Sequence, residues 1–388
     1  MEKIRDIERD EILRKEIRAA GLKAILAWYP EDIVMTGGTW PCNGITLCLY
    51  PVDGQPVFYA GAGEPPDVLP PGFLHRRFTP QPGAWGELRN QLAGDLVLLG
   101  VRAGEIGITG DVGQHALPSF PGETTPLTQA AAAIILEGMS PRDATPLFDR
   151  LSQKKTRREI EAIRRANAAA RAGLEAFHAS LKPGRTEVHV AAAVESAIQE
   201  HSGSGGCALA RGWAHVQGGA NVSMAGTFSR SSATKLADGD LVLVELATCV
   251  DGYWSDLTRT APVGRRIGER PRALLTAVRE AQAAAIAAVR PGATHEQIDA
   301  VARKYLAGKG LGSGFTHNCG HHVGFRYHDR GPTLQAGSLA PLEAGMVITV
   351  EPGAYGVDLG GGARFEDNVL VTADGAEVLS PRDVAWKP

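Results

Sequence analysis

Two segments of the chain carry nearly the same phrase, an apolar strand that ends in a carboxylate. They read Gly239-Asp-Leu-Val-Leu-Val-Glu245 and Gly345-Met-Val-Ile-Thr-Val-Glu351. A second acid follows each of them within fifteen residues, Asp256 after the first segment and Glu366 after the second. A carboxylate with apolar strand neighbours is poorly solvated, which is costly unless it is paired or bound to metal. Four acids on two similar β-hairpins therefore indicate a site for two metal ions.

The repeat extends upstream of both hairpins. In the first half, helical patterns at 164–181 and 188–198 flank the turn Pro183-Gly-Arg-Thr186. In the second half, helical patterns at 274–289 and 298–306 flank the turn Pro291-Gly-Ala-Thr294. Each threonine can cap the helix that follows it by accepting a hydrogen bond from a free N–H group. Two copies of helix, turn, helix and hairpin predict one pseudo-symmetric domain built from an ααββ repeat.

Residues 1–150 differ in pattern from this repeat, which occupies residues 154–388. Short apolar strands are expected at 22–28, 45–50, 57–60, 96–101 and 106–109, alternating with helices, and a hairpin turn is expected at Val52-Asp-Gly-Gln55. This alternation predicts a smaller mixed α/β domain. The basic stretch from Lys154 to Arg158 is expected to be a solvated helix start where the second domain begins.

Composition excludes several classes of function. The 40 basic and 43 acidic residues leave no large field for nucleic acid or an anionic membrane. The charged start is unlike a secretory signal, and no apolar run reaches the roughly 20 residues of a membrane span, so we expect a soluble cytoplasmic protein. Five cysteines without Cys-x-x-Cys spacing argue against a disulfide framework and against a zinc–thiolate site.

Histidines gather between the two acid-bearing strands. Four of the eleven lie between His317 and His328. A neutral imidazole from the pair His321 and His322 would complete a site of five protein ligands. Hard oxygen ligands of this kind favour Mn, Co, Fe or Zn over copper.

The order of these residues resembles that of a known family. The ligand series is Glu245, Asp256, His321, Glu351 and Glu366, and it falls in the phrases Ser-Asp-Leu-Thr-Arg-Thr, His-x-x-x-His-x-Val-Gly, Val-Glu-Pro-Gly and Arg-Phe-Glu-Asp-Asn-Val-Leu-Val. These phrases resemble the pita-bread metallopeptidases, which include methionine aminopeptidase, aminopeptidase P, prolidase and creatinase. The resemblance covers residues 154–388, and residues 1–150 resemble the creatinase-type domain that precedes it. An α+β fold is implied, with a pita-bread C-terminal domain.

The resemblance also implies roles for these residues. Asp256 and Glu366 would bridge two divalent ions, His321 would bind one of them and Glu245 the other. Manganese is the metal most expected, with Co, Zn or Fe as alternatives. A metal-bridged hydroxide would attack a peptide carbonyl while Glu351 serves as general acid and base.

Three further residues match family positions around the reacting carbonyl. His317 and His328 would contact the substrate carbonyl, and Arg364 would orient ligand carboxylates. Relatives with this N-terminal domain are often homodimers, so a homodimer that takes a short peptide or small molecule is expected.

Two positions depart from the family pattern. Glu245 stands where the family has Asp. The extra methylene of Glu245 carries its carboxylate about 1.5 Å further from the backbone than Asp would. In the loop 219–228 the family's substrate-contacting His is replaced near Gly226. His215, eleven residues earlier, is a spatial substitute or a structural residue.

Three functions therefore remain open. The first is an Xaa-Pro aminopeptidase or dipeptidase that uses two metals. The second keeps the fold but acts as a creatinase-like or ectoine-hydrolase-like C–N hydrolase, or a lyase, on a small metabolite. The third is a non-catalytic relative that binds without turnover.

Overall fold

The computed structural model describes residues 5–384 apart from 41–45, 67–68, 80, 82, 111–128, 205–206, 227–229 and 265–266. The chain divides into two compact units between Ser152 and Gln153. In the described part of the chain, no helix is long and apolar enough to cross a membrane. Cys42 lies outside the described residues, and the other four cysteines are buried thiols that form no disulfide.

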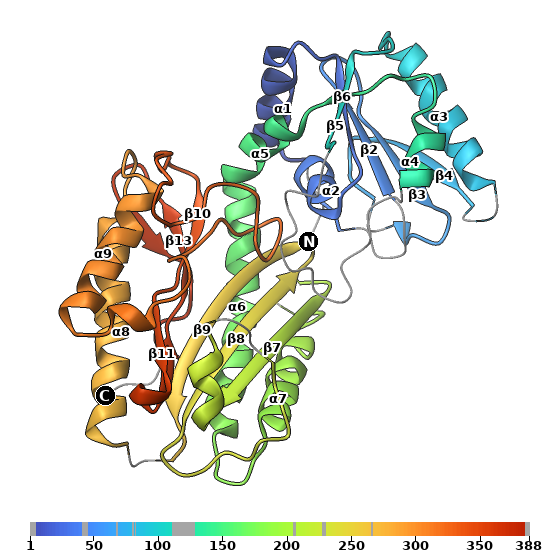
Figure 1. Cartoon of the computed structure of the whole chain (residues 1–388). Coiled ribbons are helices and arrows are strands. Elements are labelled where there is room, and N and C mark those ends of the chain that lie inside the picture. The colour runs from blue at the N-terminus through green and yellow to red at the C-terminus, as the bar shows by residue number, and fades with distance from the viewer. Residues whose placement is uncertain are drawn as a thin grey trace. The chain divides into compact units, whose positions relative to one another are not determined.

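The first unit is a mixed sheet with helices around it, as the alternating pattern predicted (Figure 1). Its strands lie in the order β4-β3-β2-β1-β5-β6. The elements are α1 (Ile7–Ala19), β1 (Ala24–Ala27), α2 (Pro30–Gly37), β2 (Thr46–Pro51), β3 (Val57–Gly61), β4 (Leu74–Phe78), α3 (Ala84–Leu98), β5 (Ile106–Ile108), α4 (Gln129–Ile135), β6 (Arg142–Asp143) and α5 (Thr145–Gln153). Strands β2 and β3 form the predicted antiparallel hairpin, and Gly54 in its turn has φ 98°.

The strand predicted at 96–101 is wrong, because these residues belong to the end of α3 and the turn after it. Leu88, Leu92 and Leu96 are buried at intervals of four residues, which is the spacing of one helix face. Val97 and Leu98 are 78% and 80% exposed. The apolar run therefore mixes one buried helical position with exposed ones, and a short run of this kind does not distinguish a strand from a helix.

The second unit contains the two predicted halves. The first half comprises α6 (Arg157–Ser180), α7 (Glu187–Gln199), β7 (Ala210–Gly218), β8 (Leu241–Val250) and β9 (Tyr253–Pro262). The second comprises α8 (Glu269–Ala288), α9 (His295–Gly308), β10 (Val347–Val350), β11 (Gly353–Gly356), β12 (Gly361–Arg364), β13 (Asp367–Val371) and β14 (Ala376–Val378). Thr186 and Thr294 cap α7 and α9 as predicted, each accepting from the N–H group three residues on.

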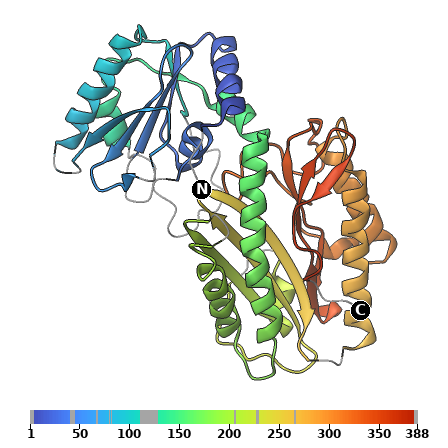
Figure 2. The same ribbon diagram turned by 180° about the vertical axis from the view of Figure 1, so that it is seen from behind.

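Each half buries its own apolar core between helices and strands. Helices α6 and α7 cover the β7-β8-β9 sheet, and the long helix α6 runs across its back in Figure 2. Helices α8 and α9 pack against the strands of the second half (Figure 1). The sheet of the first half meets the two small sheets of the second half through β9, which lies beside β12 and β13. The acid-bearing strands of both halves are thereby brought together.

The two hairpins differ in continuity. Strands β8 and β9 pair without interruption over ten residues each. The second hairpin is instead broken into β10–β13 and β11–β12, because two residues on each side leave the ladder: Glu351 and Pro352 opposite Phe365 and Glu366. Pro352 has no N–H group to donate to a ladder. The break places both glutamates at positions without strand pairing, where their side chains are free to turn toward the first hairpin.

The basic stretch at the start of α6 is not solvated throughout, contrary to expectation. Lys155 is fully buried and its Nζ lies 2.9 Å from Oδ2 of Asp329, which is also fully buried. The backbone N–H groups of Phe325 and Arg330 donate to the same carboxylate, each at 3.1 Å. This ion pair fixes residues 317–330, the histidine-rich turn, to the start of the domain.

Candidate metal centre

The first hairpin presents its acids on one face. Glu245 on β8 pairs in register with Thr258 on β9, and Asp256 lies two residues before Thr258 on the same strand. Paired residues, and residues two apart on one strand, share a face of the sheet. Glu245, Asp256 and Thr258 therefore all point toward the second half.

The second half supplies two glutamates from its broken hairpin. Glu366 is buried, and its Oε2 accepts from the hydroxyl of Thr258 at 2.7 Å. The backbone N–H of Glu366 also donates to the carbonyl of Thr258 at 3.1 Å. Glu351 follows β10, and its backbone N–H donates to the carbonyl of Cys319 at 2.9 Å. Each glutamate is held through its backbone, so its carboxylate is aimed by the fold.

His321 is oriented toward these carboxylates. Its Nδ1 lies 2.9 Å from the backbone carbonyl of His322, which places the proton on Nδ1 and leaves Nε2 as an acceptor. Nε2 lies 3.4 Å from Oδ2 of Asp256 and 3.5 Å from Oε1 of Glu351. A carbonyl partner for the distal nitrogen is the arrangement typical of a metal-binding imidazole. The alternative imidazole, His322, is turned away and its Nε2 lies 3.1 Å from Nε2 of His295.

Among the residues that the structure describes, three buried polar atoms in this cluster have no hydrogen-bond partner. They are Oδ1 of Asp256, Oε1 of Glu366 and Nε2 of His321. Ligand atoms of His321, Glu351 and Glu366 lie within 4.8 Å of one another, as do those of Asp256, His321 and His328. Unpartnered buried acceptors of this kind are costly unless a cation satisfies them. The donor set of carboxylate oxygens and one imidazole suits a hard or borderline divalent ion.

The pKa shifts of the clustered carboxyl groups also indicate a site for a cation. Burial, followed by the neighbouring Glu366 carboxylate, raises the pKa values of Asp256 and Glu351 well above their usual range. Burial also raises the pKa of Glu366, against the lowering effect of Arg364. Several carboxylates in one buried site disfavour one another's ionisation, and a bound divalent cation reverses that balance.

Glu245 differs from the other three acids, because both of its carboxylate oxygens accept hydrogen bonds and its pKa is lowered. Arg364 donates through Nη2 to its Oε2, and the hydroxyl of Tyr327 donates to its Oε1. Burial favours the neutral carboxyl, but Arg364 and Tyr327 outweigh it and lower the pKa of Glu245. Glu245 belongs to neither group of converging ligand atoms in the described part of the chain. The sequence offered no signal for Tyr327 beyond its place in the histidine-rich turn.

The predicted residues His317 and Arg364 lie in one hydrogen-bonded chain with Tyr355 on β11. Arg364 Nη1 donates to the Tyr355 hydroxyl at 3.2 Å, and that hydroxyl lies 3.0 Å from Nε2 of His317. Nδ1 of His317 lies 2.7 Å from the carbonyl of Asn318. Burial, followed by the nearby Arg364, lowers the pKa of His317 to about 3, so the imidazole is neutral. Tyr355 is a further residue that sequence reasoning missed.

His328 and His215 both lie beside the cluster. The ring of His328 is 3.9 Å from that of His321 and stacks on Tyr327 at 4.2 Å. Its Nε2 is 3.8 Å from Oδ2 of Asp256. His215 on β7 pairs in register with Glu245, so the two share a face of the sheet. His215 thus neighbours the Glu245 side of the cluster.

Gly226, near which the family resemblance predicts the loss of a histidine, is tightly packed. A Cβ atom on Gly226 would lie 2.7 Å from Oγ1 of Thr316 and 2.7 Å from the Tyr355 ring. The same ring lies against Gly353 and Gly362, where a Cβ atom would come within 2.7 Å and 2.5 Å of its carbons. Residues 227–229 of this loop lie outside the described residues. The ring of Tyr355 therefore fills the space next to Gly226.

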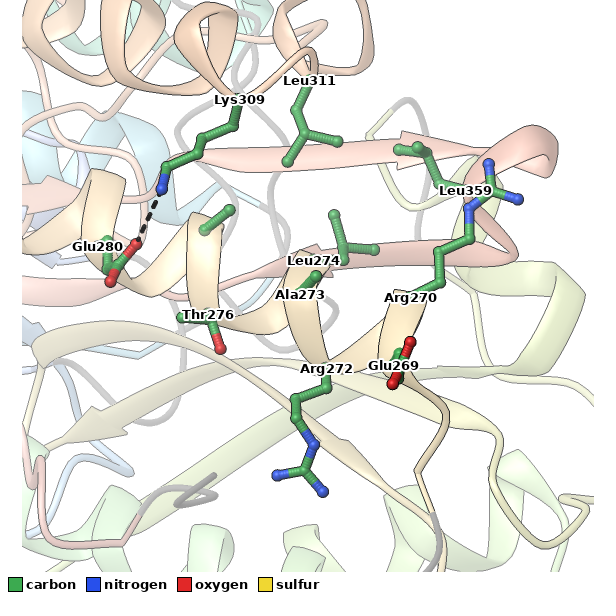
Figure 3. Close-up of a pocket in the computed structure, with 11 residues that line it drawn as sticks. Glu269, Arg270, Arg272, Ala273, Leu274, Thr276, Glu280, Lys309, Leu311 and Leu359 are labelled. Carbon is green, nitrogen blue, oxygen red and sulfur yellow. Dashed lines mark ion pairs between the residues drawn. The ribbon is translucent and has the colours of Figure 1, made fainter.

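A surface groove on the second half is separate from the centre (Figure 3). It has a volume of about 490 Å³ and is lined mainly by the first turns of α8, with Lys309, Leu311 and Leu359 opposite. An ion pair of 3.8 Å between Lys309 and Glu280 lies at one end. None of its lining residues belongs to the predicted site.

The fold and the cluster together define a pita-bread protein with a metal centre rich in carboxylates and histidine. The sequence profile of metallopeptidase family M24 matches residues 161–373, which is more than half of the chain. The chain belongs to this family. Membership implies divalent metal ions, and the cluster described above fits them.

Similar proteins include peptidases. The chain is 38% identical over 246 residues to the probable dipeptidase PepE of Mycobacterium bovis, covering 62% of this chain and 61% of that protein. It is 35% identical over 226 residues to the Xaa-Pro dipeptidase of Pyrococcus furiosus, covering 58% and 62%. The solved prolidase from Pyrococcus furiosus superposes with a TM-score of 0.76 at 25% identity, covering 95% of this chain and 99% of that one. The sequence alignments thus span about three fifths of the length of these curated relatives.

Proposed function

We propose that the protein is a metal-dependent Xaa-Pro peptidase that hydrolyses short peptides, with a centre held by Asp256, His321, Glu351, Glu366 and Glu245. The observation that carries the proposal is that Asp256, His321 and Glu366 belong to two overlapping groups of converging ligand atoms, and each keeps a buried polar atom without a partner among the described residues. The relatives named Xaa-Pro dipeptidase and prolidase support the substrate class.

The side chains divide the work of such a reaction. Divalent ions held by this set supply Lewis acidity and lower the pKa of water. Glu351 is suited to moving a proton, because its side chain is 12% exposed whereas that of Asp256 is 1% exposed. His317 and His328 would contact the substrate carbonyl, as the family resemblance implies. Arg364 orients Glu245 by donating a hydrogen bond to its Oε2.

The finer parts of the proposal come from the family resemblance. Manganese is the expected metal, with Co, Zn or Fe as alternatives that the same oxygen-rich set accommodates. A homodimer in the cytoplasm is the expected state of the protein. Metal analysis of the purified protein tests the identity of the metal. Its sedimentation in solution tests the homodimer.

A substrate panel tests the function directly. The full chain, loaded with Mn²⁺ or Co²⁺, is assayed on Xaa-Pro dipeptides, on Xaa-Pro tripeptides and on matched peptides without proline. Cleavage of the Xaa-Pro bond in preference to the matched peptides is the expected result. A metal-loaded protein that turns over none of them contradicts the proposal.

Glu351→Ala tests the proton-transfer role. We expect turnover to fall by about 10³-fold or more, because the variant loses a ligand and its proton carrier together. Glu343→Ala is the matched control, since Glu343 lies at the surface in an ion pair with Lys154 before β10. Near-normal turnover by Glu351→Ala, in a sample whose circular dichroism matches wild type, would refute the assignment.

One observation favours a second function. Gly226 lacks the imidazole that contacts substrate in the family, and Tyr355 and Thr316 occupy the adjoining space. A centre altered in this way could act on a C–N bond of a small metabolite, as a creatinase-like or ectoine-hydrolase-like enzyme does. Turnover of cyclic or acylated amino acids by a sample inactive on every peptide would select this function.

A further inference from the structure

Glu245 is held by two donors that come from different parts of the second unit. Tyr327 lies in the histidine-rich turn and donates its hydroxyl proton to Oε1, while Arg364 lies at the end of β12 and donates to Oε2. Tyr327 is buried and its ring stacks on His328 with the ring planes 16° apart. Arg364 is buried and is itself positioned by Thr258 and Tyr355. Both donors are therefore fixed before any ligand arrives.

The remaining acids are not engaged in this way. Asp256 and Glu366 each keep one buried oxygen that accepts no hydrogen bond from any described residue. Ligand atoms of Glu351, Glu366 and His321 already lie within 4.8 Å of one another. One part of the centre is thus preorganised for a cation, whereas both oxygens of Glu245 are in use.

We propose that Tyr327 and Arg364 form a clamp on Glu245 that makes the two metal positions unequal. One divalent ion binds tightly among Asp256, His321, Glu351 and Glu366. A second ion binds only when the carboxylate of Glu245 leaves the hydroxyl of Tyr327. This inference rests on the proposed function for the existence of the metal centre, and it adds Tyr327 as a positioning residue.

The extra methylene of Glu245 is what makes the clamp geometrically accessible. A glutamate on β8 carries its carboxylate further from the strand than an aspartate would, toward Tyr327 and Arg364. A hydrogen bond to a charged acceptor is strong enough that breaking it weakens the competing metal step by about ten- to a hundredfold.

If Tyr327 instead helps Glu245 to bind metal, removal of its hydroxyl should change the affinity of the second metal step in the opposite direction. A carboxylate oxygen has two lone pairs, so a hydroxyl can also orient it for a metal. If Tyr327 orients Glu245, removal of the hydroxyl weakens the second metal step. If Tyr327 competes with the metal, removal of the hydroxyl strengthens that step.

Metal titration of the full chain separates these roles. Metal-stripped wild type and Tyr327→Phe are titrated with Mn²⁺ by calorimetry, and bound metal is counted at each ratio. We expect two steps in wild type, and in Tyr327→Phe a second step about tenfold tighter with the first unchanged. Tyr305→Phe is the matched control, because it removes a tyrosine hydroxyl that donates to Glu280 at the surface at 2.6 Å.

Further outcomes keep the test decisive. Glu245→Asp, which draws the carboxylate back from Tyr327, is expected to strengthen the second step in the same direction. Spin-coupled Mn²⁺ pairs in the electron paramagnetic resonance spectrum should then form at lower metal ratios than in wild type. A second step unchanged or weakened in Tyr327→Phe overturns the clamp while the metal centre stands. Absence of metal binding by wild type overturns the proposed function itself.

Discussion

A charged residue in a sequence does not reveal whether the fold gives it a partner, and Lys155 illustrates the difficulty. Its neighbours in the basic stretch suggest a solvated helix start, yet its ammonium group is buried against Asp329. The repeated phrase with its acids led to the prediction of the candidate ligands, and the structure brings atoms of Asp256, His321, Glu351 and Glu366 into two overlapping groups. The partners of Glu245 could not be predicted, because Tyr327 and Arg364 reach it from segments with no spacing relation to β8.

Lys155→Met should destabilise the protein strongly. Removal of one partner leaves the Asp329 carboxylate buried without its counter-charge, which costs about 3–5 kcal/mol. Lys154→Met is the matched control, since Lys154 pairs with Glu343 where both side chains are half exposed and such pairs contribute about 0–1 kcal/mol. Urea unfolding of the two variants measures the difference. Equal losses of unfolding free energy would show that the buried pair has no special weight.

Helices and strands could be predicted where the hydrophobic periodicity extended over many residues. The prediction was wrong where the apolar run was short. The helices of the repeat, with threonine caps at Thr186 and Thr294, follow from long amphipathic patterns and turn residues. Residues 96–101 gave only a brief apolar run, and its helical burial depends on packing that a short run does not encode. The break in the second hairpin was also missed, because strand pairing at Glu351 and Glu366 depends on tertiary contacts with Cys319 and Thr258.

Gly94→Ala tests the corrected assignment of α3. Gly94 is exposed inside the helix and a Cβ atom there meets nothing within 4 Å, so the substitution should stabilise the protein by about 0.5–1 kcal/mol. Gly107→Ala on β5 is the contrasting variant, since its Cβ atom would lie 2.6 Å from Leu22 and 2.8 Å from Ala144. Thermal unfolding distinguishes them. A loss of stability in Gly94→Ala would argue against the helix.

The chain as a whole divides at a change of pattern that the sequence also displays. The six-stranded sheet and its core lie before the boundary between Ser152 and Gln153, and the three smaller sheets with their two main cores lie after it. The repeat revealed the pseudo-symmetric architecture of residues 153–388, because the same local rules apply twice. The strand order of the six-stranded sheet was not predictable, because parallel pairs such as β1 with β5 join residues distant in the chain.

Metal should act on one unit only. Scanning calorimetry of the full chain with and without excess Mn²⁺ is expected to resolve a metal-dependent and a metal-independent transition. At about a hundred times the dissociation constant, the metal stabilises the unit that binds it by about 2.7 kcal/mol. Chelation with EDTA should reverse that shift. A metal-induced shift of both transitions by the same amount would contradict this assignment.

The packing of Tyr355 against Gly226, Gly353 and Gly362 has a consequence for anyone who seeks to restore the family's imidazole. Histidine at 226 and the aromatic ring at 355 exclude each other, because both need the same volume. Gly226→His alone should therefore displace the ring and release Arg364 and His317 from its hydroxyl. Only a paired exchange, with a small residue at 355, leaves space for the new side chain. A histidine at 226 is thus expected to be accommodated only together with a smaller side chain at 355.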